Sequence, residues 1–507
     1  MERTSTLLFF LSFITAARAQ PGILDATFSD DGIVQMDLVP VGESGQDALP
    51  TDDGRLYVCG YLNEGAQDHG FVLRLLPDGT PDATFGTVVL PSGNGGRALR
   101  MAYAADSSLY ICGFADTLGY EAFTLWHVLA SGTMDASFGY GGRSSVQIGF
   151  NDARARHLAV QPDGLIVLVG YESAGFGRDG ALVRFSPDGT LDTSFSGDGI
   201  LLMDSYSQLD QLDAVALMDD GSIIGGGYAR VNNFDRALII NVTPSGSLAS
   251  GFGTQGLLTP DLSANNSRIY SVAVSGTQVI AAGALITSST SSDVFITRRN
   301  ANGAADNTFG TFGVAEIDVE DDDQLDDMEI LPDGRIVVTG YTGSTAPGGD
   351  IDFLLGCYEA NGQPDLSFGT DGIVVTETSP NYESGYSVCV QPDGKLVVTG
   401  FGGVFGNTAL VVLRYANDLS TTMTEKPLRE NLLLYPNPAT DHVCVQLSEH
   451  VATDIGLIDG TGRLVGSWNS VGDRIVELPL HRIRAGLYMV RVTQQGLVGT
   501  RTLEILR

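Results

Sequence analysis

The chain has 507 residues, enough for more than one domain, and carries 61 acidic against 28 basic side chains, a formal net charge of −33. Such a negative field repels nucleic acid and anionic lipid and favours cations or basic partners, so no nucleic-acid ligand is expected. Residues 431–507 hold seven arginines and seven acidic side chains, so the whole charge excess lies upstream. The composition therefore divides the chain into an acidic body and a neutral C-terminal part.

Residues 1–19 have the layout of a secretory signal peptide. Arg3 precedes an apolar run at 7–14, which the small residues Ala17 and Ala19 follow. We expect cleavage before Gln20 and a soluble mature protein after export. The apolar run is shorter than the roughly 20 residues that a membrane-spanning helix needs, and no later segment comes close, so no transmembrane segment is predicted.

Residues 20–417 repeat a short sequence that ends in Asp, two small residues and Phe in its clearest copies, with weaker copies at Phe252 and Phe309. The seven phenylalanines are Phe28, Phe85, Phe138, Phe195, Phe252, Phe309 and Phe368. Their successive spacings are 57, 53, 57, 57, 57 and 59 residues. Spacing this regular indicates an array of one repeated structural unit.

Each unit is predicted to contain four short antiparallel strands, because apolar runs of four to six residues are bounded by Pro-Asp-Gly, Asn-Gly or Ser-Gly. In unit four the strands are expected at 200–203, 214–218, 222–225 and 236–240. A glycine also recurs after the turn and strand of every unit. These landmark glycines are Gly60, Gly113, Gly170, Gly227, Gly283, Gly340 and Gly400.

A four-stranded sheet cannot bury both of its faces alone, and radial stacking of copies is the commonest closed solution for units of this size. The sequence therefore predicts an all-β fold, a seven-bladed β-propeller of about 57-residue repeats. The phenylalanines are expected to pack between neighbouring blades. The aspartate of the five clearest copies suits a turn, so we assign a structural role to Asp25, Asp82, Asp135, Asp192 and Asp365.

The repeated words Leu-Asp-x-Ser/Thr-Phe-Gly, Pro-Asp-Gly-Lys-Ile-Val-Val-x-Gly and Arg-x-x-Pro-Asp-Gly resemble the delta-60 repeat of bacterial surface proteins over about residues 21–417. The resemblance implies a propeller-like surface protein and carries over no catalytic residue. Unit two departs from the pattern at 106–108 and 126–128, and unit five at 275–277. We expect these two blades to be distorted or differently decorated.

Acidic side chains are densest where unit six passes between its first two strands. They are Asp318, Glu320, Asp321, Asp322, Asp323, Asp326, Asp327 and Glu329. Calcium prefers several oxygen ligands, so a calcium site is one interpretation. The Asp-x-Asp-x-Asp-Gly order of a calcium loop does not occur here, which favours a solvated acidic loop and no cofactor.

The five cysteines do not indicate a disulfide framework, because their number is odd and no two are close in sequence. They are Cys59, Cys112, Cys357, Cys389 and Cys444. Cys59 and Cys112 occupy the same place in units one and two and are expected to be small buried apolar residues. A bridge between these two is the alternative, subject to the strict limit on Cα separation.

No catalytic motif was found: His-Glu-x-x-His, Gly-x-Ser-x-Gly and a glycine-lysine phosphate loop do not occur, and the six histidines are scattered. Carboxylates abound, but none differs in its local sequence from its repeat counterparts. His127 and Trp126 in the irregular unit two are the best candidates for a nonrepeated site, although a packing role is favoured for both. We therefore expect no enzyme activity, no catalytic residue and no metal site.

Residues 418–430 are polar and are predicted to be a linker, and residues 431–507 are predicted to form a small β-sandwich. This module is similar to the C-terminal sorting domain of the type IX secretion system of Bacteroidetes. The matching positions are Pro436, Asn437, Pro438, Gly462, Arg463, Gly486 and Tyr488. The resemblance implies contact with the type IX machinery and export through the periplasm to the outer cell surface or the medium. Each matching residue is also explained as a turn or core residue of the sandwich.

We interpret the chain as an exported, monomeric, noncatalytic binding or adhesion scaffold whose ligand is a glycan or a protein, because function in repeat folds usually lies on loops. One alternative is a carbohydrate-active or other hydrolytic propeller with carboxylates in the central channel. Another is a purely structural module. Nonrepeated Asp, Glu, His and aromatic side chains at one channel mouth favour an enzyme, equivalent residues favour a scaffold, and a structural module predicts no cleft.

Overall fold

The computed structural model describes residues 21–65, 67–149, 151–174, 177–203, 210–262, 266–288, 291–344, 349–379, 382–404, 407–417, 433–446, 452–459, 464–471, 475–480, 483–484, 486–494 and 497–506. The chain divides into two compact units, Met1–Asp418 and Leu419–Arg507. The predicted signal peptide, with Ala17, Ala19 and Gln20, and the predicted linker 418–430 lie outside the described residues. Within the described ranges, no helix is long and apolar enough to cross a membrane.

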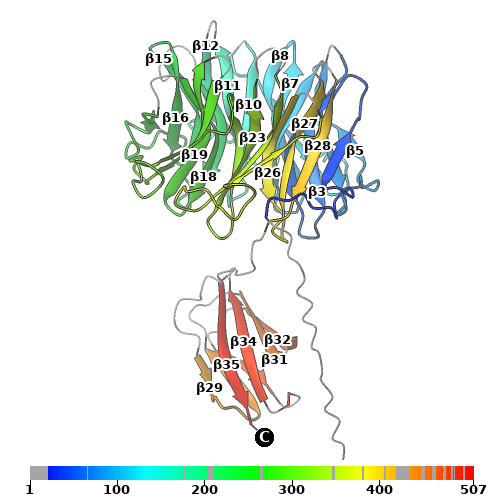
Figure 1. Ribbon diagram of the computed structural model, residues 1–507, viewed down its shortest axis with the longest axis vertical. Coiled ribbons are helices and arrows are strands. Elements are labelled where there is room, and N and C mark those ends of the chain that lie inside the picture. Colours follow the sequence, from blue (N-terminus) through cyan, green and yellow to red (C-terminus); the bar gives the residue numbers. More distant parts are fainter. Residues whose placement is uncertain are drawn as a thin grey trace, which may run out of the picture. The chain divides into compact units, whose positions relative to one another are not determined.

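In the described part of the first unit, seven four-stranded sheets form the blades of a β-propeller (Figure 1). Blades one to three are β2 (Glu43–Pro50), β3 (Leu56–Asn63), β4 (Asp68–Leu75) and β5 (Thr87–Val89); β6 (Gly96–Tyr103), β7 (Leu109–Thr117), β8 (Tyr120–Val128) and β9 (Arg143–Val146); and β10 (Ala153–Val160), β11 (Ile166–Ala174), β12 (Gly177–Phe185) and β13 (Ile200–Met203). Blades four to six are β14 (Asp210–Leu217), β15 (Ile223–Val231), β16 (Phe234–Val242) and β17 (Leu257–Leu258); β18 (Asn266–Ser275), β19 (Gln278–Ser288), β20 (Ser291–Arg299) and β21 (Val314–Ile317); and β22 (Gln324–Ile330), β23 (Ile336–Gly343), β24 (Ile351–Tyr358) and β25 (Ile373–Thr376). Blade seven is β26 (Tyr382–Val390), β27 (Leu396–Val404), β28 (Asn407–Tyr415) and β1 (Ile33–Met36).

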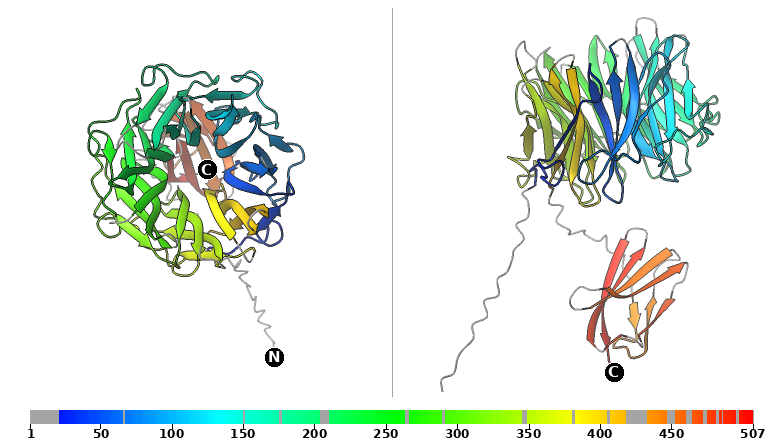
Figure 2. Two further views of the ribbon diagram at one scale, coloured as in Figure 1. Left: turned by 90° about the horizontal axis from the view of Figure 1, so that it is seen from above. Right: turned by 90° about the vertical axis from the view of Figure 1, so that its right-hand side faces the viewer.

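The blades form a closed ring around an axis, as the left view of Figure 2 shows. The innermost strands contact one another in cyclic order, β2, β6, β10, β14, β18, β22, β26 and again β2. One parallel bridge between Ile351 and Tyr382 also joins the sixth and seventh sheets. The predicted seven-bladed propeller is therefore confirmed.

The ring is closed by hydrogen bonds between the two ends of the repeat region. β1 pairs antiparallel with β28, from Ile33 opposite Leu413 to Met36 opposite Leu410. The seventh blade thus takes three strands from the C-terminal end of the array and its outermost strand from the N-terminal end. An edge that would otherwise expose unpaired N–H and C=O groups is paired in this way.

The strand composition expected for unit four was wrong in one respect. Residues 200–203 do form a strand, but β13 pairs with β12 of the third blade and not with the fourth. A sequence unit is therefore offset from a structural blade by one strand. This offset is what leaves β1 to complete the seventh blade.

The seven landmark phenylalanines are buried, with exposed fractions of 0–5%. Phe195, for example, lies in a core that Leu182 of blade three and Leu212 of blade four share. A glycine of the following blade covers its ring: a Cβ on Gly246 would lie 2.9 Å from Phe195, and the φ of this glycine is +86°. Gly79, Gly189 and Gly362 cover Phe28, Phe138 and Phe309 in the same way. The repeated Gly and Phe thus form one contact between consecutive blades.

An arginine completes this contact in four of the blades. Arg184 Nε donates to Asp192 at 2.7 Å, and its guanidinium lies 4.6 Å from the centroid of the Phe195 ring. Its Nη1 donates to the carbonyl of Pro244 in the next blade at 2.5 Å. The equivalent pairs are Arg74 with Asp82, Arg298 with Asp306, and Arg414 with Asp25. We call this arrangement of Arg, Asp and Phe the arginine clamp.

The landmark aspartates also hold their own turns. Asp192 accepts from the backbone N–H and the hydroxyl of Ser194 at 3.0 and 2.7 Å. A hydrogen bond from Thr84 lowers the pKa of Asp82 to about 2, and one from Thr308 does the same for Asp306. A turn and an interblade contact therefore account for these carboxylates, as the sequence led us to expect.

The acidic run of unit six spans the crossover from β21 to β22 and continues along β22. Asp323 is fully buried and accepts from the backbone N–H of Val319 at 2.6 Å and from the hydroxyl of Thr342 at 2.5 Å. Glu43 and Glu383 accept backbone N–H groups at the equivalent place in other blades. Part of the run thus caps a crossover loop. In the described ranges, no group of three or more His, Cys, Asp and Glu side chains is placed to hold a metal ion.

The two irregular units form complete blades, so distortion, one of the two expectations for them, was wrong; the other, different decoration, holds for blade two, where His127 bonds the landmark Asp135 in place of an arginine. Blade two keeps all four strands, β6 to β9, and blade five keeps β18 to β21. All five cysteines are free, including Cys59 and Cys112, which are fully buried in different blades. The bridge between these two, considered as an alternative, is therefore not formed.

The second unit consists of a three-stranded and a four-stranded sheet over one core in its described residues. The first sheet holds β29 (Leu433–Tyr435), β30 (His442–Gln446) and β33 (Ile475–Pro479), and the second β31 (Ala452–Asp459), β32 (Leu464–Val471), β34 (Gly486–Gln494) and β35 (Leu497–Ile505). Pro436, Asn437 and Pro438 follow β29, and Gly486 begins β34. The Tyr488 hydroxyl donates to the carbonyl of Arg484 at 2.9 Å. Gly462 and Arg463 lie outside the described residues.

We expect Phe195→Ala to destabilise the propeller by about 3–5 kcal/mol, because it opens a cavity between two blades that cannot close around it. Tyr140→Ala is the matched control, since Tyr140 is 94% exposed and its loss should change stability by no more than about 0.5 kcal/mol. Urea unfolding followed by tryptophan fluorescence measures both. Equal midpoints for the two variants would contradict the anchor role.

Candidate functional site

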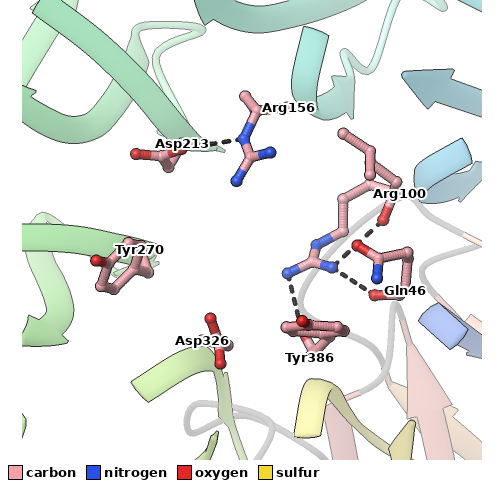
Figure 3. Close-up of a pocket in the computed structure, with 8 residues that line it drawn as sticks. Gln46, Arg100, Arg156, Asp213, Tyr270, Asp326 and Tyr386 are labelled. Carbon is pink, nitrogen blue, oxygen red and sulfur yellow. Dashed lines mark hydrogen bonds and ion pairs between the residues drawn. The ribbon is translucent and has the colours of Figure 1, made fainter. Parts of the chain in front are cut away.

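Every innermost strand contains one β-bulge at the same place. In β14, for example, the register shifts between Leu212 and Ala214, so Asp213 is the extra residue. The seven extra residues are Gln46, Leu99, Arg156, Asp213, Tyr270, Asp326 and Tyr386. A bulge redirects a side chain, and here all seven line one cavity together with Arg100 (Figure 3). The cavity has a volume of about 60 Å³.

The landmark glycines make these bulges sterically possible. Gly227 of β15 lies opposite Leu212, the residue before the bulge, and a Cβ on Gly227 would lie only 1.9 Å from the carbonyl oxygen of Gln211. The other six landmark glycines lie opposite the same position, with separations of 1.8–1.9 Å. The recurrent glycine of the sequence is therefore required because the backbones of the two inner strands of each blade approach each other closely beside the axis.

The side chains around the axis are of several chemical kinds, although the seven bulge positions are equivalent in the backbone. Arginines lie on blades two and three, as Arg100 and Arg156, and aspartates lie on blades four and six, as Asp213 and Asp326. Tyr270 separates the two aspartates. The cavity thus has a basic and an acidic side.

Arg100 links three consecutive blades on one side of the axis. Its Nη1 donates to the carbonyl of Gln46 at 2.6 Å, and its Nη2 donates to the carbonyl of Tyr386 at 3.0 Å. These two carbonyls belong to blades one and seven. The guanidinium therefore joins three blades and contributes positive charge at the cavity wall.

Arg156 and Asp213 form an ion pair that leaves hydrogen-bonding capacity unused. Arg156 Nε donates to Asp213 Oδ1 at 3.1 Å, and Gln211 donates to the same oxygen at 2.6 Å. Asp213 is 7% exposed, and its buried Oδ2 has no hydrogen-bond partner among the described residues. A buried carboxylate oxygen without a donor is costly, so Asp213 reduces the stability of the folded protein at this place.

Asp326 on blade six accepts from Gln324 at 3.2 Å and from the Ser384 hydroxyl at 3.3 Å. Burial raises the pKa of Asp326 to about 6. Burial also raises the pKa of the Tyr270 and Tyr386 hydroxyls, so both are neutral phenols at pH 7. The acidic side of the cavity therefore combines carboxylates with neutral hydroxyls.

Two further carboxylates connect neighbouring innermost strands. Asp47 accepts from the Ser387 hydroxyl at 2.8 Å and from the backbone N–H of Met101 at 2.7 Å, and burial raises its pKa to about 6. Asp327 makes the equivalent bonds to blades five and seven. Burial, and then the charges of Asp327 and Asp47, raise the pKa of Glu329 to about 7. Negative charge is therefore concentrated around the axis.

Ser108, His127 and Asp135 form a series of contacts in the order of a catalytic triad. Ser108 Oγ lies 2.6 Å from His127 Nε2, and His127 Nδ1 lies 2.9 Å from Asp135 Oδ2. Ser108 is only 2% exposed, and its hydroxyl is also within hydrogen-bonding distance of Asp106. A nucleophile has to reach its substrate, so this burial argues against catalysis.

His127 occupies the place that the clamp arginine has in other blades. Its partner Asp135 is the landmark aspartate of blade two, and its ring centroid lies 5.2 Å from that of the anchor Phe138. Trp126 is fully buried, and its indole N–H donates to the carbonyl of Pro91 at 2.9 Å. The two residues singled out from the sequence are thus packing residues, as favoured there.

The axial residues were not recognised as a site from the sequence. The sequence places Asp326 in the acidic run of unit six, and it marks none of the other six bulge residues. A usable signal does exist, because each axial residue follows the partner of a landmark glycine in the innermost strand. Finding it requires knowing the register between the two strands, which the sequence does not show.

Comparison with known proteins supports the fold and the two-part organisation. A family model described as a domain of unknown function (DUF5122) beta-propeller matches residues 51–85, 161–195, 331–368 and 391–421. A model described as a secretion system C-terminal sorting domain matches residues 433–505. The chain carries DUF5122 propeller repeats and a type IX sorting domain. The sorting domain interacts with the type IX machinery and directs the protein to the cell surface or the exterior.

No curated protein matched the sequence. Among solved structures, the propeller protein is similar to one of unknown function from Dyadobacter fermentans, with 9% identity, 76% of this chain and 99% of that chain covered, and a TM-score of 0.40. It is also similar to Sqt1 from Chaetomium thermophilum, with 13% identity, 78% and 99% coverage and a TM-score of 0.41. The polysaccharide lyase Uly1 shows 12% identity, 75% and 91% coverage and a TM-score of 0.43. Likenesses this distant carry no argument about function.

We expect Gly227→Ala to destabilise the protein by about 1–3 kcal/mol, because the added Cβ meets the Gln211 carbonyl and forces β14 and β15 apart. Gly251→Ala is the control, since a Cβ there meets no atom within 4 Å. Chemical unfolding measures both. If both variants unfold at the same denaturant concentration, the glycine is not required for the bulge.

Stability should pass through a maximum between about pH 4 and pH 5. Asp326 and Glu329 have folded pKa values of about 6 and 7, above the ordinary 3.8 and 4.5, so the folded state binds their protons more tightly and gains stability as the pH falls from 8. Asp82 and Asp306 have folded pKa values of about 2, so their contribution is lost as the pH falls below 3.8.

Melting temperatures from pH 2 to pH 8 test this dependence. Asp326→Asn and Glu329→Gln should each reduce the rise between pH 8 and pH 5 without changing the acid limb. A wild-type melting temperature that increases steadily up to pH 8 would show that ionisation of the buried axial carboxylates does not destabilise the folded protein.

Proposed function

We propose that the exported propeller is a noncatalytic binding scaffold at the cell surface and that it recognises its ligand at the axis. The observation that carries this proposal is that the seven equivalent bulge positions hold residues of five different types, Gln, Leu, Arg, Asp and Tyr, around one cavity. Where packing is the requirement, as at the phenylalanine anchors, the same residue recurs in every blade. A ring without a ligand does not require different residues at its axis. A site that recognises an asymmetric ligand does require them.

The hydrolytic alternative has one specific observation in its favour. Unlike carboxylates and aromatic side chains gather at the axis, and Asp326, with its pKa raised to about 6 by burial, faces the same cavity as Asp213. Two carboxylates in different environments are the arrangement that general acid and base catalysis uses. Judged by these axial residues, hydrolysis is therefore the second candidate function.

The size and connections of the cavity favour binding over hydrolysis. Ligand pockets in enzymes commonly measure about 300–1,000 Å³, whereas this cavity measures about 60 Å³. Asp326 is also held by two side-chain donors. The only arrangement of catalytic-triad type among the described residues is buried inside a blade interface. A small polar cavity supports capture of a compact group better than cleavage of a polymer.

The purely structural alternative predicts no cleft, and the axial cavity speaks against it. Asp213 in its wall also has a buried Oδ2 without a partner among the described residues, which a module selected only for stability would not be expected to retain. The excess of acidic side chains in the propeller further favours a cationic or basic group on the ligand or its carrier.

Binding to glycan and protein arrays, with and without calcium, tests the proposed function. We expect the purified protein, from residue 20 onward, to bind a defined ligand without converting it, and Asp213→Asn to weaken that binding. Asp53→Asn is the matched control, because Asp53 is 54% exposed and lies in a turn between β2 and β3. Turnover of a polysaccharide that Asp326→Asn abolishes would replace the scaffold by the hydrolase.

A further inference from the structure

We propose that a second pocket, beside the axis, binds the ring of a neutral pyranose sugar within a glycan. This pocket has a volume of about 570 Å³ and is lined by residues of blades one, two, six and seven. Its aromatic side chains are Tyr61, Tyr382, Tyr386 and Phe401, and we call it the aromatic pocket. Tyr386 also lines the axial cavity. The inference therefore rests on the binding function proposed above and names the class of its ligand.

Aromatic residues recur beside the axis, and arginines cover most of them. The residue after the landmark glycine is aromatic in six of the seven blades. Arginine guanidinium groups lie 4.0–4.5 Å from the ring centroids of four of these residues, Tyr61, Phe114, Tyr171 and Tyr228. Arg97 of blade two, for example, lies 4.0 Å from the centroid of Tyr61 in blade one. A guanidinium in this place occupies one face of the ring.

The arginine is replaced at the boundary between blades seven and one. Arg97 lies opposite Phe114 in blade two, and the residue opposite Tyr61 in blade one is Ser44. Ser44 and Phe401 of blade seven both line the aromatic pocket. Within the described ranges, no arginine lies over Phe401 as Arg97 lies over Tyr61. A serine in the place of an arginine thus leaves room for a pocket at this boundary.

The rings of the aromatic pocket suit a sugar. The centroids of Tyr386 and Phe401 are 5.5 Å apart, with an angle of 35° between the ring planes. Both residues are half-buried, as is Tyr382, so each keeps part of its surface open. A pyranose carries most of its hydroxyl groups around its edge and C–H groups on its faces. These C–H groups pack well against the electron-rich face of an aromatic ring.

Polar groups accompany the rings, as the hydroxyl groups of a sugar require. The side-chain oxygen of Asn63 accepts from the backbone N–H of Gly65 at 2.9 Å, which leaves the amide nitrogen of Asn63 as a donor. The hydroxyl of Thr408 donates to the carbonyl of Glu43 at 2.8 Å and can still accept a hydrogen bond. A few polar groups among aromatic side chains fix the orientation of a bound ligand.

Charged ligands fit the aromatic pocket less well than a neutral one. The described residues that line it include no carboxylate to attract a cation, and they include Arg97. Arg97 is already paired with Asp68, whose Oδ2 lies 2.6 Å from both Nε and Nη2, so an anion would have to compete with this carboxylate. The negative charge of the propeller therefore acts on the carrier of the glycan and not on the sugar in the pocket.

Isothermal titration of the purified protein, from residue 20 onward, with cellopentaose, xylopentaose and mannopentaose tests the inference. At least one of these neutral oligosaccharides should bind. Sorbitol, an open-chain polyol without a ring face, should bind about 10-fold or more weakly. Phe401→Leu keeps an apolar side chain but removes the aromatic ring, so it should weaken oligosaccharide binding by about 10-fold.

Ser44→Arg should weaken binding by at least as much, because the new guanidinium would cover Phe401 as Arg97 covers Tyr61. Phe401 is only half-buried, so its leucine variant is expected to fold even if Ser44→Arg does not. Phe114→Leu is the matched control, since Phe114 holds the equivalent place in blade two, lies 4.5 Å from the Arg154 guanidinium and does not line the pocket. This control should leave binding unchanged.

Three results would overturn the pyranose: none of the oligosaccharides binds, sorbitol binds equally well, or the folded Phe401→Leu variant binds as the wild type does. An array ligand that Asp213→Asn weakens and Phe401→Leu does not would also overturn it, while leaving the proposed function in place. A protein that binds neither an oligosaccharide nor any array ligand would contradict both proposals.

Discussion

The contact between consecutive blades is the constraint on which the rest of this structure depends. Each four-stranded sheet has two apolar faces, and only a neighbouring sheet can cover each of them. In this contact a buried phenylalanine packs its ring against a glycine of the following blade. In four blades an arginine clamp is added. Because every blade needs two neighbours, the array has to close, and β1 closes it by pairing with β28.

At the axis the backbone geometry repeats from blade to blade, whereas at the blade interfaces the side chains repeat. Every innermost strand has one bulge, and a glycine of the next strand lies too close to its backbone to admit a Cβ. The side chain on the bulge lines the cavity and takes no part in the phenylalanine contact between blades. It can therefore differ from blade to blade, as Arg156, Asp213 and Tyr270 do, without disturbing that contact. A nearly symmetric fold thereby carries an asymmetric site.

Blade two shows how a structural contact can take on the appearance of a catalytic one. When histidine stands at the place of the clamp arginine, it still reaches the landmark aspartate, and Ser108 completes a Ser-His-Asp series. The distances alone suit a triad. The burial of Ser108 and the equivalent arrangement of Arg184, Asp192 and Phe195 in the next blade identify it as a packing contact.

The sequence by itself determined the repeat, the all-β class, the number of blades and the sorting module, because turns such as Pro-Asp-Gly, buried phenylalanines and alternating strands impose local patterns that recur at fixed spacing. Only the tertiary structure decided that a blade begins one strand later than a sequence unit and that Gln46, Leu99, Arg156, Asp213, Tyr270, Asp326 and Tyr386 meet around one cavity. These residues are tens to hundreds of positions apart, and none of them contacts another through a local pattern. Their meeting depends on the strand register and on closure of the ring, which are properties of the assembled chain and not of any one repeat.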